Sequence, residues 1–438
     1  MVAIQDLRVG MFIHLDLGWM SHPFPLSSFK IASVEQIEII RGLGQKQVRW
    51  SPERSDEAVA GAGSAAEALA AEAAAAQAAA ATAAIAAAAK PPLDPAAEAR
   101  RLAAARQAAE VAALRQCERQ YGEACRDLRR VTDRVTAAPE EARDSAQQLT
   151  RAMLDKMLQD GELCVRVLGE PSGDRATAHA MNVTVISLLL ARSLSMSEAD
   201  LMDLGTGALL HDIGKAQLPD RVRLPRDDFS AAEQALYRDH VAQGVVLGRR
   251  MGLPTGALLV LAQHHEHADG SGFPKAVKLD AISPAARVVA MVNRYDNLCN
   301  AALPSLSLTP HEALSRMFAQ SRNRFDATIL SGFIRLMGIY PPGSLVQLSD
   351  ERHAMVVSVN AARPLKPRVQ VFEPRPSGDR TVHLDLDQVP DLGIRRSLKA
   401  EHLPVRVAEC LTPRLRVAYF FDVEPAQALG QEAVAEAV

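Results

Sequence analysis

The chain has 438 residues, which is long enough for roughly two to four domains and for a buried core of ordinary size. Lysine and arginine number 49 against 52 aspartate and glutamate residues. The resulting formal net charge of -3 gives no electrostatic argument for binding DNA, RNA or an anionic membrane. The five cysteines form no CxxC pair, which argues against a disulfide scaffold or a thiolate zinc site and favours a reducing, cytoplasmic location.

The first part of the chain, residues 1–52, contains both tryptophans and short β-type runs such as MFIHLDL and KQVRW, separated by glycine and proline. We expect a small β-containing domain here. The first residues lack a basic region followed by a long apolar run, so they predict folded protein and not a signal peptide.

A biased segment follows, in which alanine supplies 20 of the 30 residues from 61 to 90. Alanine favours helix but offers no large apolar face, so residues 53–160 are predicted to be an Ala-rich and charged helical spacer. Helices are expected from Pro95 to about residue 138 and from Pro139 toward residue 159. Residues 73–89 are interrupted by polar side chains and are mostly alanine, so no membrane span is predicted.

The remainder of the chain divides into three regions. Residues 161–340 read as amphipathic helices with ordinary caps, including a capping box that starts at Ser230. Residues 341–424 contain alternating runs such as HAMVVSV and RLRVAYFF, which predict a small β-rich domain, and residues 425–438 predict a flexible tail. The predicted fold class is therefore mainly α, with a central helical domain and a β-containing domain on each side.

Histidine is concentrated in the central region, where six of the twelve histidines fall between residues 179 and 267. The pair His211 and Asp212 follows an apolar helical run, and Lys215 lies four residues after His211 on the same helix face. A carboxylate beside an imidazole can bridge two cations, and the ammonium group can meet an anionic substrate oxygen. Such pairs are also common on helix surfaces, so this pair alone does not define a metal site.

A second motif comprises His264 and His265, which follow the apolar run GALLVLAQ and precede the segment DGSGFP at 269–274. Consecutive histidines at the end of a buried helix are difficult to explain as solvated surface. The loop glycines permit positive φ and a close approach of the backbone to a ligand. Together with His211 and Asp212, this motif predicts a divalent metal site, whereas His267 is interpreted as a surface or substrate-facing residue.

These residues resemble the HD-GYP family, a subgroup of the HD phosphohydrolase superfamily that hydrolyses the bacterial second messenger cyclic di-GMP. The similarity covers roughly residues 165–340, where the family's loop HHExxDGxGYP corresponds to HHEHADGSGFP, with Phe273 in place of the tyrosine. Residues 1–52 resemble the small domain of unknown function that often precedes HD-GYP domains. The resemblance implies an all-helical HD-type bundle as the catalytic domain.

The resemblance also implies two divalent metal ions, most often iron or manganese, and Asp212 and Lys215 as catalytic residues. The implied ligands of one ion are His179, His211, Asp212 and, as a doubtful fourth, Asn293. The implied ligands of the other ion are Asp212, His240, His264 and His265. Substrate would contact Lys215 and a pocket rim made of Gly270, Ser271, Gly272, Phe273 and Pro274.

The chain departs from the family pattern at three places. A glutamate that helps to hold a third ion in some members corresponds to Arg175, so no third ion is expected. The aspartate that ends the ligand set corresponds to Asn293, which removes one negative charge and weakens cation binding; Asp296, one helical turn away, is an unproven substitute. The family's basic nucleotide-binding stretch is replaced by NAALPSLSL at 300–308, which has no basic residue.

The predicted function is a cytoplasmic metal-dependent phosphodiesterase that converts cyclic di-GMP to the linear dinucleotide, with further cleavage to GMP left open. Two alternatives remain. One is a degenerate HD-GYP domain that acts as a sensor or protein-interaction module, and the other is a metal hydrolase with a different nucleotide or phosphoester substrate. The expected partners are a cyclic dinucleotide, a second copy of the chain through the helical spacer, and signalling proteins, but no DNA or RNA.

Overall fold

The computed structural model describes residues 1–15, 28–43, 45–56, 95–159, 161–169, 174–226, 228–375, 378–412 and 416–424. The chain divides into two compact units, Met1–Ala109 and Glu110–Val438. The alanine-rich run at 61–90, with its candidate membrane span, and the predicted tail at 425–438 lie outside the described residues. No helix in the described part of the chain combines the length and the apolar character needed to cross a membrane.

The first unit contains a small antiparallel sheet with the strand order β1-β4-β2-β3. The strands are β1 (Val2–Ala3), β2 (Phe12–His14), β3 (Ser28–Lys30) and β4 (Gln47–Trp50), and the helix is α1 (Val34–Gly42). Ile13 of β2, Ile31 and Ile40 of α1 are fully buried in one apolar cluster, so the helix packs on the sheet. The prediction of a small β-containing domain is confirmed.

Two long helices follow, α4 (Pro95–Arg134) and α5 (Pro139–Met157), and both begin at proline as predicted. The residues after Glu110 nevertheless belong to the second unit and are not a free spacer. Tyr121 and Leu128 of α4 and Met153 of α5 are buried in its core. The difference has a simple cause, because large apolar side chains recur at helical spacing in this part and are lacking in the alanine-rich run.

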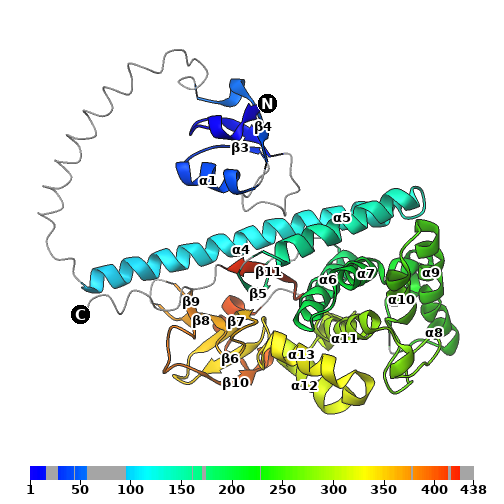
Figure 1. Ribbon diagram of the computed structural model, residues 1–438. Helices are drawn as coiled ribbons and strands as arrows, with labels where there is room; N and C mark the ends of the chain where they lie inside the picture. The colour runs from blue at the N-terminus through cyan, green and yellow to red at the C-terminus, as the bar shows by residue number, and fades with distance from the viewer. Residues whose placement is uncertain are drawn as a thin grey trace, which may run out of the picture. The chain divides into compact units, whose positions relative to one another are not determined.

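The helical bundle of the second unit confirms the predicted central helical domain (Figure 1). Its helices are α6 (Arg175–Ser193), α7 (Glu198–Leu210), α8 (Ala231–Arg238), α9 (His240–Met251), α10 (Thr255–Gln263), α11 (Pro284–Cys299), α12 (Pro310–Ser321) and α13 (Ala327–Met337). Helix α7 packs against α6 and α10, and α11 packs against α6 and α10. The short helix η3 (Ile213–Gln217) follows α7 and lies against α9, which brings the segment after α7 next to the start of α9.

A seven-stranded antiparallel sheet forms the rest of this unit, with the order β10-β6-β7-β5-β11, and with β8 paired to β7 and β9 paired to β8. The strands are β5 (Glu162–Val167), β6 (Leu345–Leu348), β7 (His353–Asn360), β8 (Arg368–Glu373), β9 (Arg380–Asp385), β10 (Ile394–Leu398) and β11 (Tyr419–Glu424), and α14 (Val405–Leu411) lies beside them. The predicted β-rich C-terminal region is confirmed. Strand β5 precedes the helical bundle in sequence, yet it pairs with β11 from Tyr419 opposite Val167 to Glu424 opposite Glu162. The sheet therefore places the last strand next to the start of α6.

Candidate metal centre

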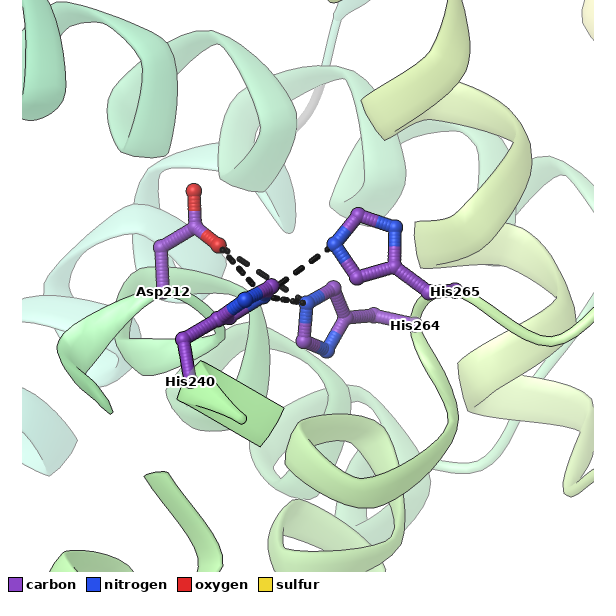
Figure 2. Close-up of side chains that lie close together, drawn as sticks. All are labelled: Asp212, His240, His264 and His265. Carbon is purple, nitrogen blue, oxygen red and sulfur yellow. Dashed lines mark hydrogen bonds and ion pairs between the residues drawn. The ribbon is translucent and has the colours of Figure 1, made fainter. Parts of the chain in front are cut away.

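Six of the predicted side chains meet at one place in the helical bundle. They form two sets that share Asp212: His179, His211 and Asp212, and Asp212, His240, His264 and His265. In each set the ligand atoms lie within 4.8 Å of one another. Figure 2 shows the second set, in which the three imidazoles point toward the Asp212 carboxylate. Residues from α6, from the ends of α7 and α10 and from the start of α9 are thus brought together by helix packing.

A close backbone contact holds the segment after α7 against α9. A Cβ atom on Gly214 would collide with the backbone of His240 and Gly244, so only glycine permits this approach. Asp212 lies two residues before Gly214, and His240 lies at the start of α9. The glycine therefore allows Asp212 to face His240.

Three of the imidazoles are held in the same way at helix ends. Each Nδ1 atom contacts the backbone carbonyl three residues earlier, at 2.7 Å for His211 to Ala208, 2.5 Å for His240 to Tyr237 and 2.9 Å for His264 to Leu261. A carbonyl only accepts, so each Nδ1 carries the proton and donates it. In the neutral ring this leaves the lone pair on Nε2, which is the tautomer that binds a metal through that atom.

The free nitrogens face one another at short range. The Nε2 atoms of His211 and His179 are 3.2 Å apart, and those of His240 and His264 are 3.3 Å apart. The Nδ1 atom of His179 lies 2.6 Å from Asp296 and donates to it, so in the neutral imidazole the lone pair of His179 is on Nε2. Lone pairs that face each other without a proton repel, and a cation between them removes the repulsion.

The protonation state of the second set also suits a metal. Burial, the largest cause, lowers the pKa of His240, His264 and His265 from the ordinary value for histidine. The Asp212 carboxylate opposes this effect at all three imidazoles but does not outweigh it. The three imidazoles are therefore neutral near pH 7 and available as ligands.

The carboxylate of Asp212 offers one oxygen to each set. Its Oδ1 lies 3.5 Å from Nε2 of His240, and its Oδ2 lies 3.4 Å from Nε2 of His211. Burial by itself raises the pKa of Asp212, but Lys215 and His211 outweigh burial and hold this pKa well below its usual range. Oδ1 is buried and has no hydrogen-bond partner among the described residues, which costs about 1–3 kcal/mol or more for a charged group. The donor set and this unpaired oxygen fit a divalent cation.

Lys215 lies directly beside this carboxylate, with Nζ 2.5 Å from Oδ2 of Asp212. The ammonium group also lies 5.5 Å from the centre of the Tyr237 ring. Burial tends to lower the pKa of Lys215, but Asp212 and Tyr237 outweigh it, so this pKa is raised. The site thus keeps a positive charge that could meet an anionic oxygen of a substrate.

The predicted rim loop folds back onto His265. A Cβ atom on Gly272 would collide with the backbone of His265 and Glu266, and the Phe273 ring stacks on the His265 ring. The buried Glu266 carboxylate accepts the backbone N–H groups of Lys275 at 2.7 Å and Val277 at 3.1 Å. Sequence reasoning did not assign a role to Glu266, which fixes the far end of this loop.

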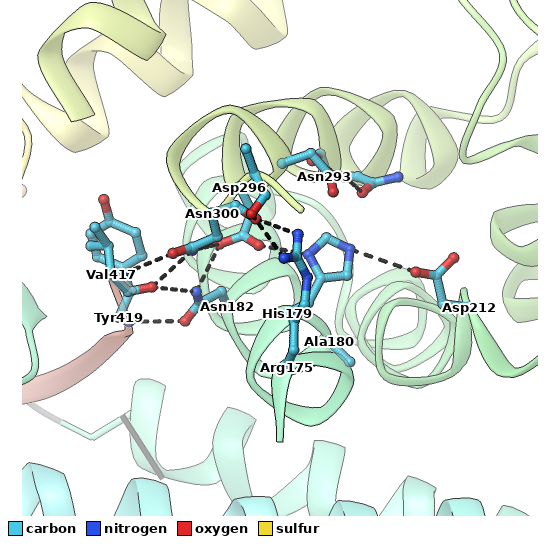
Figure 3. A network of polar contacts seen from close by, with 12 residues as sticks. Arg175, His179, Ala180, Asn182, Asp212, Asn293, Asp296, Asn300, Val417 and Tyr419 are labelled. Atoms are coloured by element: carbon cyan, nitrogen blue, oxygen red, sulfur yellow. Dashed lines mark hydrogen bonds and ion pairs between the residues drawn. The ribbon is translucent and has the colours of Figure 1, made fainter. Parts of the chain in front are cut away.

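The structure separates the two polar residues that the sequence offered as the last ligand. Asn293, in α11, is buried, and its Oδ1 accepts a hydrogen bond from Nδ2 of Asn297 at 2.6 Å. Asp296 lies behind His179, with Oδ2 2.6 Å from the Nδ1 atom that faces away from the other ligands (Figure 3). Because the Asp296 carboxylate is used on that side, this residue supports His179 and does not replace Asn293.

Arg175, at the position of the family's third-ion glutamate, has a structural contact. Its guanidinium donates to the backbone carbonyls of Ala301 at 2.8 Å and Asn300 at 2.6 Å, at the end of α11. A guanidinium has no acceptor atom and cannot ligate a cation. Arg175 therefore caps α11.

Comparison with known protein families finds two matches along the chain. The HD domain family matches residues 167–329, and a domain of unknown function, DUF3391, matches residues 1–146. The chain therefore carries an HD domain preceded by DUF3391. The second match extends well beyond residues 1–52, through the alanine-rich run and into α5.

Curated relatives are similar to part of this chain. The cyclic di-GMP phosphodiesterase PA4108 of Pseudomonas aeruginosa is 32% identical over 198 residues, which are 44% of this chain and 47% of that protein. The cyclic di-GMP phosphodiesterase response regulator RpfG of Xanthomonas campestris pv. campestris is 32% identical over 150 residues, with coverages of 34% and 39%. The 3'3'-cGAMP-specific phosphodiesterase 2 of Vibrio cholerae is 28% identical over 155 residues, with coverages of 35% and 30%. The chain spans less than half the length of each of these three relatives.

Proposed function

We propose that this HD-domain protein is a metal-dependent phosphodiesterase of the HD-GYP type that hydrolyses cyclic di-GMP to the linear dinucleotide. The observation that carries the proposal is the position of Asp212, whose two carboxylate oxygens face two separate sets of histidines. A carboxylate placed in this way is suited to hold two cations close together, as two-metal phosphoester hydrolases require.

The two sets would hold one divalent cation each, one on His179, His211 and Asp212 and the other on Asp212, His240, His264 and His265. Bound divalent cations supply Lewis-acid polarisation of a phosphodiester and lower the pKa of water. Lys215 would bind a non-bridging phosphoryl oxygen and offset the charge that develops there. Phe273 covers one face of His265 and would keep water away from that ligand.

The substrate class is inferred from the relatives together with the charges at the site. Several relatives are named for hydrolysis of cyclic di-GMP, and others for 3'3'-cGAMP, which indicates a cyclic dinucleotide. The chain lacks the basic stretch after Asn293, so attraction for the anionic substrate would come mainly from the cations and Lys215. We propose to test, in the same assay, whether the linear dinucleotide is cleaved further to GMP.

The test uses the full chain purified without oxygen. We would measure iron and manganese per chain by mass spectrometry, and follow cyclic di-GMP, 3'3'-cGAMP and their products by chromatography. The expected result is bound metal and cyclic di-GMP turnover, both lost in a variant carrying His211→Ala and Asp212→Ala. His402→Ala, at an exposed histidine outside the centre, is the matched control and should behave as the parent protein.

Each other outcome has a definite meaning. Bound metal with turnover no faster than in the double variant would show that the protein is not an enzyme on these substrates. Nucleotide binding without cleavage would support a degenerate sensor domain. The structural argument for that alternative is that Oδ1 of Asn293 already accepts a hydrogen bond from Asn297 instead of being free to bind a cation. Turnover of 3'3'-cGAMP alone would keep the chemistry and change the substrate.

A further inference from the structure

We propose that the backbone of residues 417–419, at the start of β11, is part of the support of the candidate metal centre, and that Asn182, Asn300 and Asp296 are positioning residues that connect it to His179 (Figure 3). The inference rests on the proposed function because it concerns how one metal ligand is oriented. The inference assigns a role to the C-terminal sheet, and the proposed phosphodiesterase function does not by itself require that role.

The first link is the Asp296 carboxylate, which is fully buried and accepts from three donors. Oδ2 lies 2.6 Å from Nδ1 of His179, and Oδ1 lies 2.7 Å from Nδ2 of Asn182 and 2.9 Å from Nδ2 of Asn300. A carboxylate can accept all three hydrogen bonds at once. It thereby keeps the proton on Nδ1 of His179 and leaves Nε2 of this histidine free to face His211 and Asp212.

The second link is the pair of asparagine side chains, Asn182 on α6 and Asn300 at the end of α11, that bind the backbone leading into β11. Nδ2 of Asn182 donates to the carbonyl of Val417 at 2.9 Å, and its Oδ1 accepts the N–H of Tyr419 at 2.9 Å. Asn300 also donates to the Val417 carbonyl at 2.9 Å and accepts the Val417 N–H at 2.8 Å. Each amide therefore binds Asp296 and the strand backbone at the same time.

The third link is the sheet, which fixes the strand independently of the helices. Strand β11 is paired along its length with β5, and the N–H of Leu168 donates to the carbonyl of Ala418 at 2.9 Å. The Tyr419 hydroxyl lies 3.1 Å from the hydroxyl of Tyr295 on α11. The asparagine amides thus contact a backbone that cannot shift without breaking sheet pairing.

The two ligand sets differ in this respect. The Nδ1 atoms of His240 and His264 bind carbonyls three residues earlier in the chain, those of Tyr237 and Leu261, so local structure orients them. His179 lies in the second turn of α6, and its Nδ1 partner is not a carbonyl of its own helix but Asp296 on α11. Through His179, the first set therefore depends on the C-terminal sheet, whereas His240 and His264 of the other set are oriented locally.

The experiment compares Asn182→Ala, Asn300→Ala and Asp296→Asn with the parent chain. An asparagine at 296 cannot accept from all three donors, because its NH2 group must face either the two amides or His179. The matched control is Asn360→Ala, because Asn360 lies in β7 of the same sheet and binds Glu162 at 2.5 Å, away from this network. The readouts are metal affinity by competition titration and the His179 tautomer by NMR of metal-free protein with 15N-labelled histidine.

We expect each of the three variants to bind one metal equivalent about 10–100-fold more weakly while the other equivalent is unchanged. The 15N signals should show that His179 loses its Nδ1–H tautomer in Asp296→Asn, and Asn360→Ala should change neither readout. Weakening of both equivalents together, or an unchanged His179 tautomer in Asp296→Asn, would overturn the inference. If the parent chain binds no metal, the proposed function fails, and the tautomer measurement still decides the inference.

Discussion

The phenyl ring of Phe273 stacks on the imidazole of His265, with ring centres 4.4 Å apart and ring planes 19° apart. On the same phenyl ring, the guanidinium of Arg238 lies 5.1 Å from the centre. Both contacts are made by the aromatic ring of Phe273. Neither contact requires the hydroxyl group that the family's tyrosine would carry at this position. The ring orients His265 toward His240, whose Nε2 lies 3.2 Å from that of His265.

The first prediction separates the ring from the hydroxyl. Phe273→Tyr should leave metal affinity and turnover near those of the parent protein, because the stack is kept. Phe273→Ala should weaken metal binding about 10-fold, since His265 loses the contact that orients it. Competition titration with a metal indicator measures both variants, and a large gain of turnover in Phe273→Tyr would contradict this assignment.

The second prediction concerns Lys215. Lys215→Met should lower turnover about 100-fold or more, because one positive group near the phosphoryl oxygens is lost. Metal affinity should stay equal or increase, because removal of the ammonium beside Asp212 removes repulsion for a cation. Metal per chain and initial rates test the two parts separately, with Lys399→Met at an exposed lysine as the control. A parallel loss of metal and turnover would instead mean that Lys215 only holds the site together.

The third prediction concerns Asn293. Asn293→Asp keeps an oxygen that can accept from Asn297 and adds a negative charge on the α11 turn before Asp296. We expect metal affinity to increase by about 10-fold, which corresponds to about 1.4 kcal/mol. Titration of the parent and variant chains with manganese measures the change. Asn323→Asp adds the same charge at an exposed position and should leave the affinity as it is.

The fourth prediction is a pH dependence at the start of α6, the helix that carries His179. Asp174 caps this helix by accepting the N–H and the hydroxyl of Thr177, both at 3.0 Å. Burial tends to raise the pKa of Asp174, but these hydrogen bonds outweigh it and the net pKa lies below its usual 3.8. A lowered folded-state pKa means that the carboxylate stabilises the fold above pH 3.8, and that this contribution is lost as the pH falls through the lowered value.

Asp174→Ala should therefore lower the free energy of unfolding by about 1 kcal/mol at pH 7 and by much less near pH 3. Denaturant unfolding at the two pH values measures the difference. Ser283→Ala removes an N-cap that does not titrate, the hydroxyl that accepts from Ala286 at the start of α11. Its cost should be the same at both pH values, and a cost for Asp174→Ala that does not fall with pH would contradict the assignment.

Much of the fold could be predicted because its evidence is local. Proline at the first position marked the starts of α4 and α5, and the alternating runs marked the strands of the C-terminal sheet. The extent of the spacer could not be predicted in this way, because burial of Tyr121 and Met153 depends on which surfaces the helices meet. Asn182 carried an unused clue, since a polar residue within the apolar part of α6 requires a buried hydrogen-bond partner.

The sequence by itself determined the chemistry that the centre can use. The His211 and Asp212 pair and the His264 and His265 pair are neighbours in the chain, so their residue types and helix ends are visible without a structure. Only the tertiary structure decided how His179 is held, because Asn182 is 235 residues and Asn300 is 117 residues from Val417. No local preference specifies contacts over such separations. They follow from helix packing and from the pairing of β5 with β11, which brings Tyr419–Glu424 to the beginning of the helical bundle.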